Sequence, residues 1–229
     1  MMASRHLPST LALIPDGNRR WAQHNKLSVL KGYKHGVSKF IDFSEWCVNE
    51  GIHNITVWAF SSENINRPKR EVNALFGIYE RAANDKKLME RIHENHMRIN
   101  IISNPAVMPK KLVSILNKIE EETAHYNTNV VNMLLGYGGR ADIEFAIQKM
   151  KRLRRFSVSE FSRNLMSKAI PNIDMIIRTS GEMRLSGFMP WQSAYSELYF
   201  SNKLWPDFSK KDFDMALAEY SRRERRFGK

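Results

Sequence analysis

The stretch Leu11-Ala12-Leu13-Ile14-Pro15-Asp16-Gly17-Asn18-Arg19-Arg20-Trp21 places a charged turn directly after an apolar segment. Residues 10–14 are apolar and end at a proline, which is typical of a short buried strand. Asp, Gly and Asn follow, and these residues tolerate backbone conformations that others avoid, so they predict a turn. Two arginines come next. The stretch therefore predicts a carboxylate, free backbone amides and two guanidiniums at the carboxyl end of one strand.

This combination of groups favours a phosphate-like ligand. In open α/β sheets, ligands bind at the carboxyl ends of the strands. Backbone amides and arginines suit an anionic oxygen ligand, and magnesium typically bridges a carboxylate and substrate phosphates. Taken alone, the turn has an equally good alternative interpretation as a solvated turn in which Asp16 is a helix cap.

The composition is that of an ordinary globular protein. The chain has 229 residues, 42% of them apolar, and we expect a single domain over residues 1–229. No apolar run approaches the ~20 residues that span a bilayer, and residues 1–9 lack the apolar core of a signal peptide. Cys47 is the lone cysteine and is expected to pack in the core, which fits a reducing cytoplasm. The net charge of +12 favours anionic partners without choosing among them.

Apolar periodicity alternates between strand and helix along the whole chain. We expect strands at residues 10–14, 54–60, 97–103, 130–135, 174–178 and 195–200. We expect helices after the loop 32–36, from residue 69 and continuing to 92, from 109, after 140, from 157 and from 209. Regular alternation implies an α/β fold, with a largely parallel six-stranded sheet and helices on both faces.

Arginines recur in the polar segments that follow the predicted strands. Because the strands are parallel, these segments meet at one edge of the sheet. Several independent cationic loops at this edge indicate a ligand site more strongly than one turn does. The arginines are Arg19, Arg20, Arg67, Arg140, Arg178 and Arg184.

At this point the sequence resembles a known family, the cis-prenyltransferases of the undecaprenyl diphosphate synthase type. The blocks that carry the resemblance occur in order from Asp16 to the closing Arg-Arg-Phe-Gly at 225–228, and they cover nearly the whole chain. They are Asp16-Gly17-Asn18-x-Arg20-Trp21-Ala22, the segment from Ala59 to Pro68, Tyr137-Gly138-Gly139-Arg140, the segment from Ile177 to Ser186, Trp191-Gln192-x-Ala194-Tyr195-x-Glu197 and Trp205-Pro206-Asp207-Phe208.

The resemblance implies an enzyme that condenses an allylic prenyl diphosphate with isopentenyl diphosphate. It implies a homodimer, a parallel sheet and a hydrophobic tunnel that holds the growing chain; Leu75, Phe76 and Tyr79 are candidate lining residues, with ordinary core packing as the alternative. Asp16 would hold Mg²⁺ on the donor diphosphate, Glu197 would help to bind the metal, and Asn64 would take part in proton transfer.

The resemblance also assigns substrate-binding residues on both sides of the reaction. Gly17, Asn18 and Arg20 would cradle the allylic diphosphate, and Arg178, Arg184 and Ser186 would hold that of isopentenyl diphosphate. The arginines at 223–226 would lie near the dimer interface. The full predicted substrate-binding set is Gly17, Asn18, Arg19, Arg20, Trp21, Tyr33, Ser61, Ser62, Glu63, Arg67, Arg178, Arg184, Leu185 and Ser186.

The sequence departs from the family pattern mainly on the allylic side. Arg19 replaces a usual glycine, Val29 a usual arginine and Tyr33 a usual histidine, while the isopentenyl-side arginines are intact. Ile65, Gly136, Gly187 and Pro190 depart elsewhere. Our hypothesis is altered donor or acceptor selectivity, and the alternative reaction is an irregular, lavandulyl-type condensation of two prenyl units.

Two rival functions remain to be weighed. Some relatives are non-catalytic partner subunits, but these typically lose the first-motif aspartate, and Asp16 is present. Nucleic-acid binding is suggested by the basic residues between 149 and 155, but no base-stacking motif accompanies them, so we do not expect it. Peripheral attraction to anionic membranes is the better use of this charge, because long prenyl products partition there.

Overall fold

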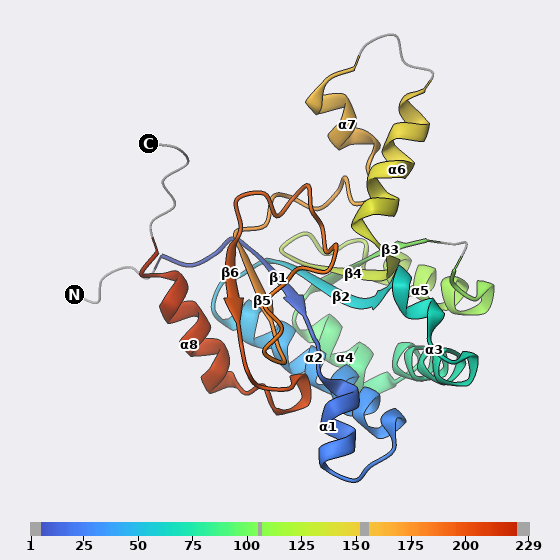
Figure 1. Ribbon diagram of the computed structural model, residues 1–229, viewed down its shortest axis with the longest axis vertical. Helices are drawn as coiled ribbons and strands as arrows, with labels where there is room; N and C mark the ends of the chain where they lie inside the picture. Colours follow the sequence, from blue (N-terminus) through green and yellow to red (C-terminus); the bar gives the residue numbers. More distant parts are fainter. Residues whose placement is uncertain (1–5, 105–106, 152–155, 224–229) are drawn as a thin grey trace.

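Six parallel strands form one sheet at the centre of the computed structural model, which describes residues 6–104, 107–151 and 156–223. The strands are β1 Thr10–Ile14, β2 Asn54–Ser61, β3 Met97–Ser103, β4 Asn129–Tyr137, β5 Met175–Arg178 and β6 Glu197–Phe200. Their order is β3-β4-β2-β1-β5-β6, and every neighbouring pair is parallel (Figure 1). The predicted parallel α/β sheet is confirmed, and β1 lies in its interior.

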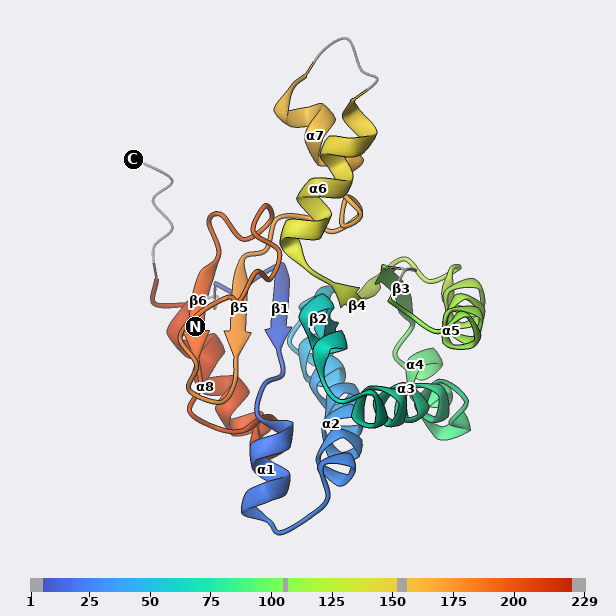
Figure 2. The same cartoon turned by 45° about the vertical axis from the view of Figure 1, so that its right-hand side comes forward.

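The helices surround this sheet unequally. They are α1 Asn18–His24, α2 Val29–Asn49, α3 Lys69–Ala83, α4 Lys86–Glu94, α5 Lys110–Thr123, α6 Gly139–Met150, α7 Val158–Asn164 and α8 Lys210–Tyr220, with short 3₁₀ turns η1 Ser62–Asn66 and η2 Trp205–Asp207. Figure 2 shows α6 and α7 standing away from the sheet, while α3 and α5 lie beyond the β3 end. None of the helices in the described ranges is both long and apolar enough to cross a bilayer.

Two different layers cover the sheet. On one face, Leu11 and Leu13 pack with apolar residues of α2, α4 and α8, and Cys47 is fully buried there as expected. On the other face, Ala12 and Ile14 pack with residues from the irregular segments 170–173 and 188–189. The alternation along β1 thus divides its side chains between two cores, as the 2-residue period of a strand requires.

The chain between α1 and α2 differs from the sequence-based prediction. The segment 32–36 was expected to be a loop, but it lies inside α2. A Cβ atom on Gly32 would lie 2.3 Å from the carbonyl oxygen of Asn18, and one on Gly36 would lie 2.2 Å from the Asn18 Oδ1 atom. The two glycines therefore allow α2 to pack closely on the start of α1, which explains them without a loop.

The long helix expected from residue 69 to 92 is two helices. The helix is interrupted at Asn84–Asp85. The Asp85 side chain accepts hydrogen bonds from the backbone N–H groups of Lys87 and Leu88 at 3.0 and 3.3 Å. Aspartate is a preferred N-cap because it satisfies such exposed donors.

The prediction concerning the arginines at 223–226 falls mostly outside the described residues, as does part of the basic stretch 149–155.

Candidate active site

The turn after β1 needs a glycine at position 17 and is held by a backbone hydrogen bond to Trp205. Gly17 has a φ of 109°, and a Cβ atom there would lie 2.9 Å from the Leu204 Cδ2 atom. The carbonyl oxygen of Asp16 accepts a hydrogen bond from the backbone N–H of Trp205 at 3.0 Å. A left-handed glycine and a backbone anchor thus fix the position of the Asp16 carboxylate at the end of β1.

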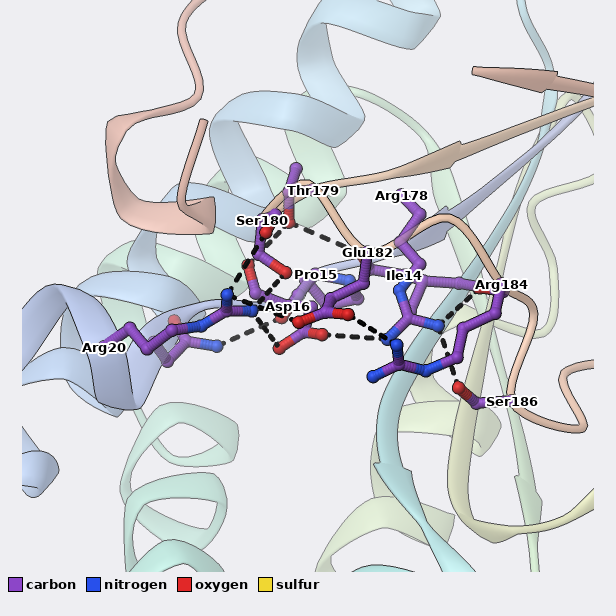
Figure 3. A network of polar contacts seen from close by, with 11 residues as sticks. Ile14, Pro15, Asp16, Arg20, Arg178, Thr179, Ser180, Glu182, Arg184 and Ser186 are labelled. Atoms are coloured by element: carbon purple, nitrogen blue, oxygen red, sulfur yellow. Dashed lines mark hydrogen bonds and ion pairs between the residues drawn. The ribbon is translucent and has the colours of Figure 1, made fainter. Parts of the chain in front are cut away.

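Arg178, the last residue of β5, lies beside this turn and is almost completely buried. The parallel register pairs it with Ile14. Its Nη2 atom donates a hydrogen bond to Asp16 Oδ2 at 2.9 Å, and its Nη1 atom donates to Ser186 Oγ at 2.9 Å and to the carbonyl oxygen of Arg184 (Figure 3). One guanidinium therefore joins the turn after β1 to the loop after β5.

A second set of contacts crosses the same edge. The Nη2 and Nη1 atoms of Arg20 donate hydrogen bonds to the hydroxyl and carbonyl oxygens of Ser180 at 2.6 and 3.2 Å. Glu182 lies between two cations, with one carboxylate oxygen 3.4 Å from Arg20 Nη1 and the other bonded to Arg184 Nη1 (Figure 3). Ser180 has a φ of 82°, a conformation that non-glycine residues adopt at a cost and that is frequent at binding sites.

A third cluster lies on the α2–α3 side of the opening, and we call it the Glu71 cluster: Arg19, Tyr33, Arg67 and Glu71. The Tyr33 hydroxyl donates to Glu71 Oε1 and accepts from Arg67 Nη1, both at 2.7 Å. Arg19 Nε and Arg67 Nη1 each lie 3.8 Å from the same carboxylate oxygen. Burial, followed by the hydrogen bond to Glu71, raises the pKa of the Tyr33 hydroxyl far above its ordinary value, so it is a neutral phenol.

The turn after β2 also faces the opening. Asn64 Oδ1 accepts a hydrogen bond from the Ser61 backbone N–H at 3.3 Å, which closes a capping box around η1. Ser61, Glu63 and Asn64 all line the cavity described below.

The loop that carries Ser186 is held from behind by a buried polar network. Asp142 is 2% exposed and accepts hydrogen bonds from the Tyr137 hydroxyl at 2.9 Å and from the Ser167 hydroxyl. Gln192 donates to the Ser167 hydroxyl at 2.7 Å, and the N–H of Gly139 bonds to the carbonyl oxygen of Gly187 at 2.9 Å. The start of α6 therefore fixes the loop on which the phosphate-binding groups would lie.

These charged groups surround the mouth of a cavity of about 1030 Å³. Behind the mouth, the lining becomes apolar along α2, through Val37, Phe40 and Ile41. It continues to Leu88 and Ile92 of α4, Ile99 of β3, and Leu116 and Ile119 of α5. The arrangement suits an amphipathic ligand with an anionic head and a long apolar tail.

Comparison with known proteins agrees with this geometry. Residues 14–228 match the family model of the undecaprenyl diphosphate synthases. The chain belongs to this prenyltransferase family. An isoprenyl transferase from Thermus thermophilus is 41% identical over 97% of this chain and 89% of its own length. A geranylgeranyl-diphosphate-specific tritrans,polycis-undecaprenyl-diphosphate synthase from Thermoplasma acidophilum is 38% identical over 97% of this chain and 89% of its own length.

Two solved structures share the fold of this prenyltransferase. The lavandulyl diphosphate synthase of Lavandula x intermedia, in complex with dimethylallyl diphosphate, superposes with a TM-score of 0.92 at 31% identity, covering 97% of this chain and 99% of its own. A probable undecaprenyl diphosphate synthase from Campylobacter jejuni has a TM-score of 0.81 at 30% identity, covering 99% of this chain and 100% of its own.

Most of the predicted site residues of the prenyltransferase lie around one cavity mouth. Residues that line the cavity are Asp16, Gly17, Asn18, Arg19, Arg20, Tyr33, Ser61, Glu63, Asn64, Arg67, Arg178 and Ser186. Of the other arginines expected at this edge, Arg140 also lines the cavity, and Arg184 contacts Glu182. Leu75 and Tyr79 line the cavity as expected, whereas Phe76 packs against Phe60 in the core.

Four predicted residues lie elsewhere. The Trp21 indole does not line the cavity; it donates to Asp207 at 2.7 Å and packs at a tilt against the His35 ring. Leu185 packs in the core beneath its loop, and Ser62 lies against Gly138. Glu197 begins β6 in register with Met175, at the amino end of the sheet, and is paired with Arg223 at 2.8 Å. The structure therefore does not bring Glu197 to Asp16 within one chain.

Sequence reasoning gave no role to Glu71, Ser180 or Glu182. A signal for Glu71 was present, because it follows Arg67 by four residues, a spacing at which opposite charges meet on a helix. No comparable pattern indicates Ser180, whose position depends on the backbone conformation of its loop.

Proposed function

We propose that this prenyltransferase condenses an allylic prenyl diphosphate with isopentenyl diphosphate, head to tail, to form a Z-configured polyprenyl diphosphate. The cavity carries the proposal. The cavity of about 1030 Å³ has charged groups at its mouth and an apolar far end, as a diphosphate that carries a growing chain requires.

We assign the diphosphates of the two substrates to opposite sides of the mouth. Asp16, Gly17, Asn18 and Arg20, at the start of α1, would hold the allylic donor. Support for an acceptor site comes from Arg178, whose buried guanidinium already bonds to the Ser186 hydroxyl, the kind of oxygen contact that a phosphate would share. Arg184 would complete the acceptor site.

The Asp16 carboxylate, together with a substrate diphosphate, would hold Mg²⁺ at the mouth. The Asp16 side chain is 36% exposed, and both of its oxygens face guanidiniums, at 2.9 Å for Arg178 and 3.8 Å for Arg20. Within the described residues, no group of three or more His, Cys, Asp or Glu side chains forms a metal cage. One carboxylate with substrate phosphates is the usual way in which proteins hold this ion. Bound there, the ion would neutralise charge on the leaving diphosphate.

The residues of the chain would support the remaining chemistry. The C1–O bond of the donor breaks and its electrons leave with the diphosphate, where Arg20 stabilises the negative charge. The double bond of isopentenyl diphosphate supplies the electrons for the new C–C bond. A proton is then lost from carbon to an oxygen of the released diphosphate, with Asn64 as the proposed proton-transfer partner. The apolar lining along α2 excludes water that would quench the cationic carbon.

Product analysis tests this reaction. Purified protein, Mg²⁺ and dimethylallyl, geranyl or farnesyl diphosphate are incubated with and without isopentenyl diphosphate, and products are identified by mass spectrometry. We expect linear Z-products that require isopentenyl diphosphate, that disappear with excess chelator and that Asp16→Ala abolishes. Branched products from dimethylallyl diphosphate alone would refute regular condensation. Unchanged turnover by Asp16→Ala would remove Asp16 from the mechanism.

An irregular, lavandulyl-type condensation is the second candidate. It is favoured by the high structural similarity to the lavandulyl diphosphate synthase, together with the changed residues on the donor side, Arg19 and Tyr33. The same incubation with dimethylallyl diphosphate alone separates the two reactions, because a branched product needs no isopentenyl diphosphate.

We also propose that the enzyme is a homodimer. The projecting α6–α7 region (Figure 2) carries exposed apolar residues: Ile147 of α6 is 52% exposed and Val158 of α7 71%. Trp191, which donates a hydrogen bond to Ser162 of α7, is 36% exposed. A second copy of the chain would cover this surface. Light scattering coupled to size-exclusion chromatography measures the mass directly, and a value near one chain would refute the dimer.

A further inference from the structure

The Glu71 cluster joins three helices at one side of the cavity mouth. Arg19 comes from α1, Tyr33 from α2 and Glu71 from α3, while Arg67 caps the carboxyl end of η1 two residues before α3. The side chains of Arg19 and Glu71 are 49% and 15% exposed, so the carboxylate lies beneath the guanidinium. Arg19, Tyr33 and Arg67 line the cavity, whereas Glu71 does not.

The Tyr33 hydroxyl connects the Glu71 carboxylate to the Arg67 guanidinium through two hydrogen bonds. The Tyr33 hydroxyl uses its one proton toward Glu71 and accepts the Nη1–H of Arg67, both at 2.7 Å. Glu71 therefore orients the Tyr33 hydroxyl, and this hydroxyl in turn orients the Arg67 guanidinium. A side chain fixed in this way keeps its orientation before a ligand arrives, which is the condition for preorganised binding.

The location of the cluster selects the ligand. Along α2, Tyr33 is followed on the same side by Val37, Phe40 and Ile41, and all four line the cavity. A molecule whose tail lies along this part of α2 would have its charged head at Tyr33. Of the two proposed substrates, the allylic donor carries the tail that lengthens with each condensation, whereas isopentenyl diphosphate always has five carbons.

We propose that the Glu71 cluster is a donor-side anion cradle, in which the carboxylate and the phenol position the two guanidiniums for the diphosphate of the allylic donor. This proposal rests on the proposed function. Glu71 and Tyr33 are positioning residues, and Arg19 and Arg67 make the contacts with phosphate oxygens. The cradle lies on the α2–α3 side of the mouth and is separate from the Arg178 contacts at the end of β5.

Net charge and positioning predict opposite results for Glu71→Gln. Removing a negative charge beside two cations would tighten diphosphate binding if attraction alone mattered. If Glu71 holds the guanidiniums in place, the neutral amide holds them less firmly and binding weakens. Tyr33→Phe complements this test, because it breaks both hydrogen bonds of the phenol without changing the charge.

The measurement is the dissociation constant of farnesyl diphosphate with Mg²⁺ and without isopentenyl diphosphate, by calorimetry. Steady-state KM values for each substrate accompany it. We expect both variants to weaken donor binding about tenfold, the loss typical of one charge-assisted hydrogen bond, with the KM for isopentenyl diphosphate within about twofold of wild type. Binding that is unchanged or tighter in Glu71→Gln, or unchanged in Tyr33→Phe, overturns the proposal.

Glu45→Gln is the matched control. Glu45 lies farther along α2 and bonds to Arg91 at 2.6 and 2.7 Å, so this variant weakens a similar carboxylate–guanidinium pair away from the mouth. We expect it to bind the donor like wild type, and thermal melts show whether each variant folds. If wild-type protein binds no prenyl diphosphate, the proposed function itself fails, which differs from failure of the variants alone.

Discussion

Glu182 is an anion placed between two guanidiniums that would bind diphosphates. It contacts Arg20 from α1 and Arg184 from the loop after β5. Arg20 has a second anchor, because Ser180 accepts hydrogen bonds from two of its nitrogens. In the Glu71 cluster the guanidiniums depend on the carboxylate and the phenol. Similar pairs of opposite charge at one mouth can therefore have different roles.

Glu182→Gln should tighten diphosphate binding. Ser180 keeps Arg20 in place, so the main consequence is the loss of a competing negative charge. Partly exposed pairs of this kind contribute at most ~1 kcal/mol, which corresponds to a gain of about fivefold. The inhibition constant of inorganic pyrophosphate, measured in low and high salt, tests this expectation. The gain should shrink in high salt, and weaker binding would show that Glu182 positions Arg20 after all.

At the scale of elements, residue patterns predicted the strands better than the connections between them. β1 and β3 have the expected bounds because β1 is a short apolar run, β3 alternates apolar and polar residues over most of its length, and each is followed by a clear terminator. The start of α2 was missed because Gly32 and Gly36 are typical of loops, whereas here they permit contact with Asn18 of α1. Such a contact depends on another part of the chain, and local sequence does not contain it.

The candidate site follows the same division. Asp16, Arg20 and Arg178 were expected at one edge because parallel strands bring their carboxyl ends together, and the three side chains do lie side by side. Trp21 was predicted to bind substrate together with its neighbours in sequence, but it does not line the cavity, and its indole donates to Asp207. The direction of a side chain on a seven-residue helix is set by packing against η2, which the motif alone does not reveal.

The N-cap of α8 offers a stability prediction at this scale. Ser209 accepts a hydrogen bond from the Asp212 N–H, and Asp212 accepts from the Ser209 N–H at 2.8 Å, a complete capping box. Because Phe213 and Leu217 of α8 are core residues, Ser209→Ala should lower the free energy of unfolding by about 1 kcal/mol. Thermal melts should show a decrease of roughly 2–4 °C. Ser157→Ala, which removes the cap of α7, is the control and should cost less, because α7 has no buried residue.

The same capping box predicts how stability changes with pH. Burial would raise the pKa of Asp212, but the hydrogen bonds from Ser209 prevail and hold it below its ordinary value. A carboxyl group with a lowered folded-state pKa stabilises the protein above its unfolded value, near 3.9, and loses that effect as the pH falls through the folded pKa. The stability difference between wild type and Asp212→Asn should therefore be present at neutral pH and vanish in acid. A difference that persists at low pH would assign it to packing.

At the scale of the whole molecule, the cavity connects the charged edge of the sheet to its depth. The mouth lies at the carboxyl ends of β1, β2 and β5. Ile99, which also lines the cavity, is the third residue of β3 and pairs with Val131, near the opposite end of the strands. With ~3.3 Å of rise per residue, the four residues from Ile99 to Ser103 represent about 13 Å of depth. The far wall, formed by β3, α4 and α5, would therefore meet the end of a growing chain.

Ile119→Ala should therefore lengthen the products. Ile119 is 7% exposed and lines the apolar part of the cavity from α5, so its truncation removes part of the wall. We expect the product distribution to shift upward by at least one isoprene unit, measured by mass spectrometry at equal conversion, and a loss of about 2–4 kcal/mol in unfolding free energy.

Ile55→Ala is the matched control, because Ile55 is fully buried in the same core cluster but does not line the cavity. It should lose comparable stability with unchanged products. If both variants lengthen the products, a loosened core is responsible, and if neither does, the end of the growing chain does not reach the wall at Ile119.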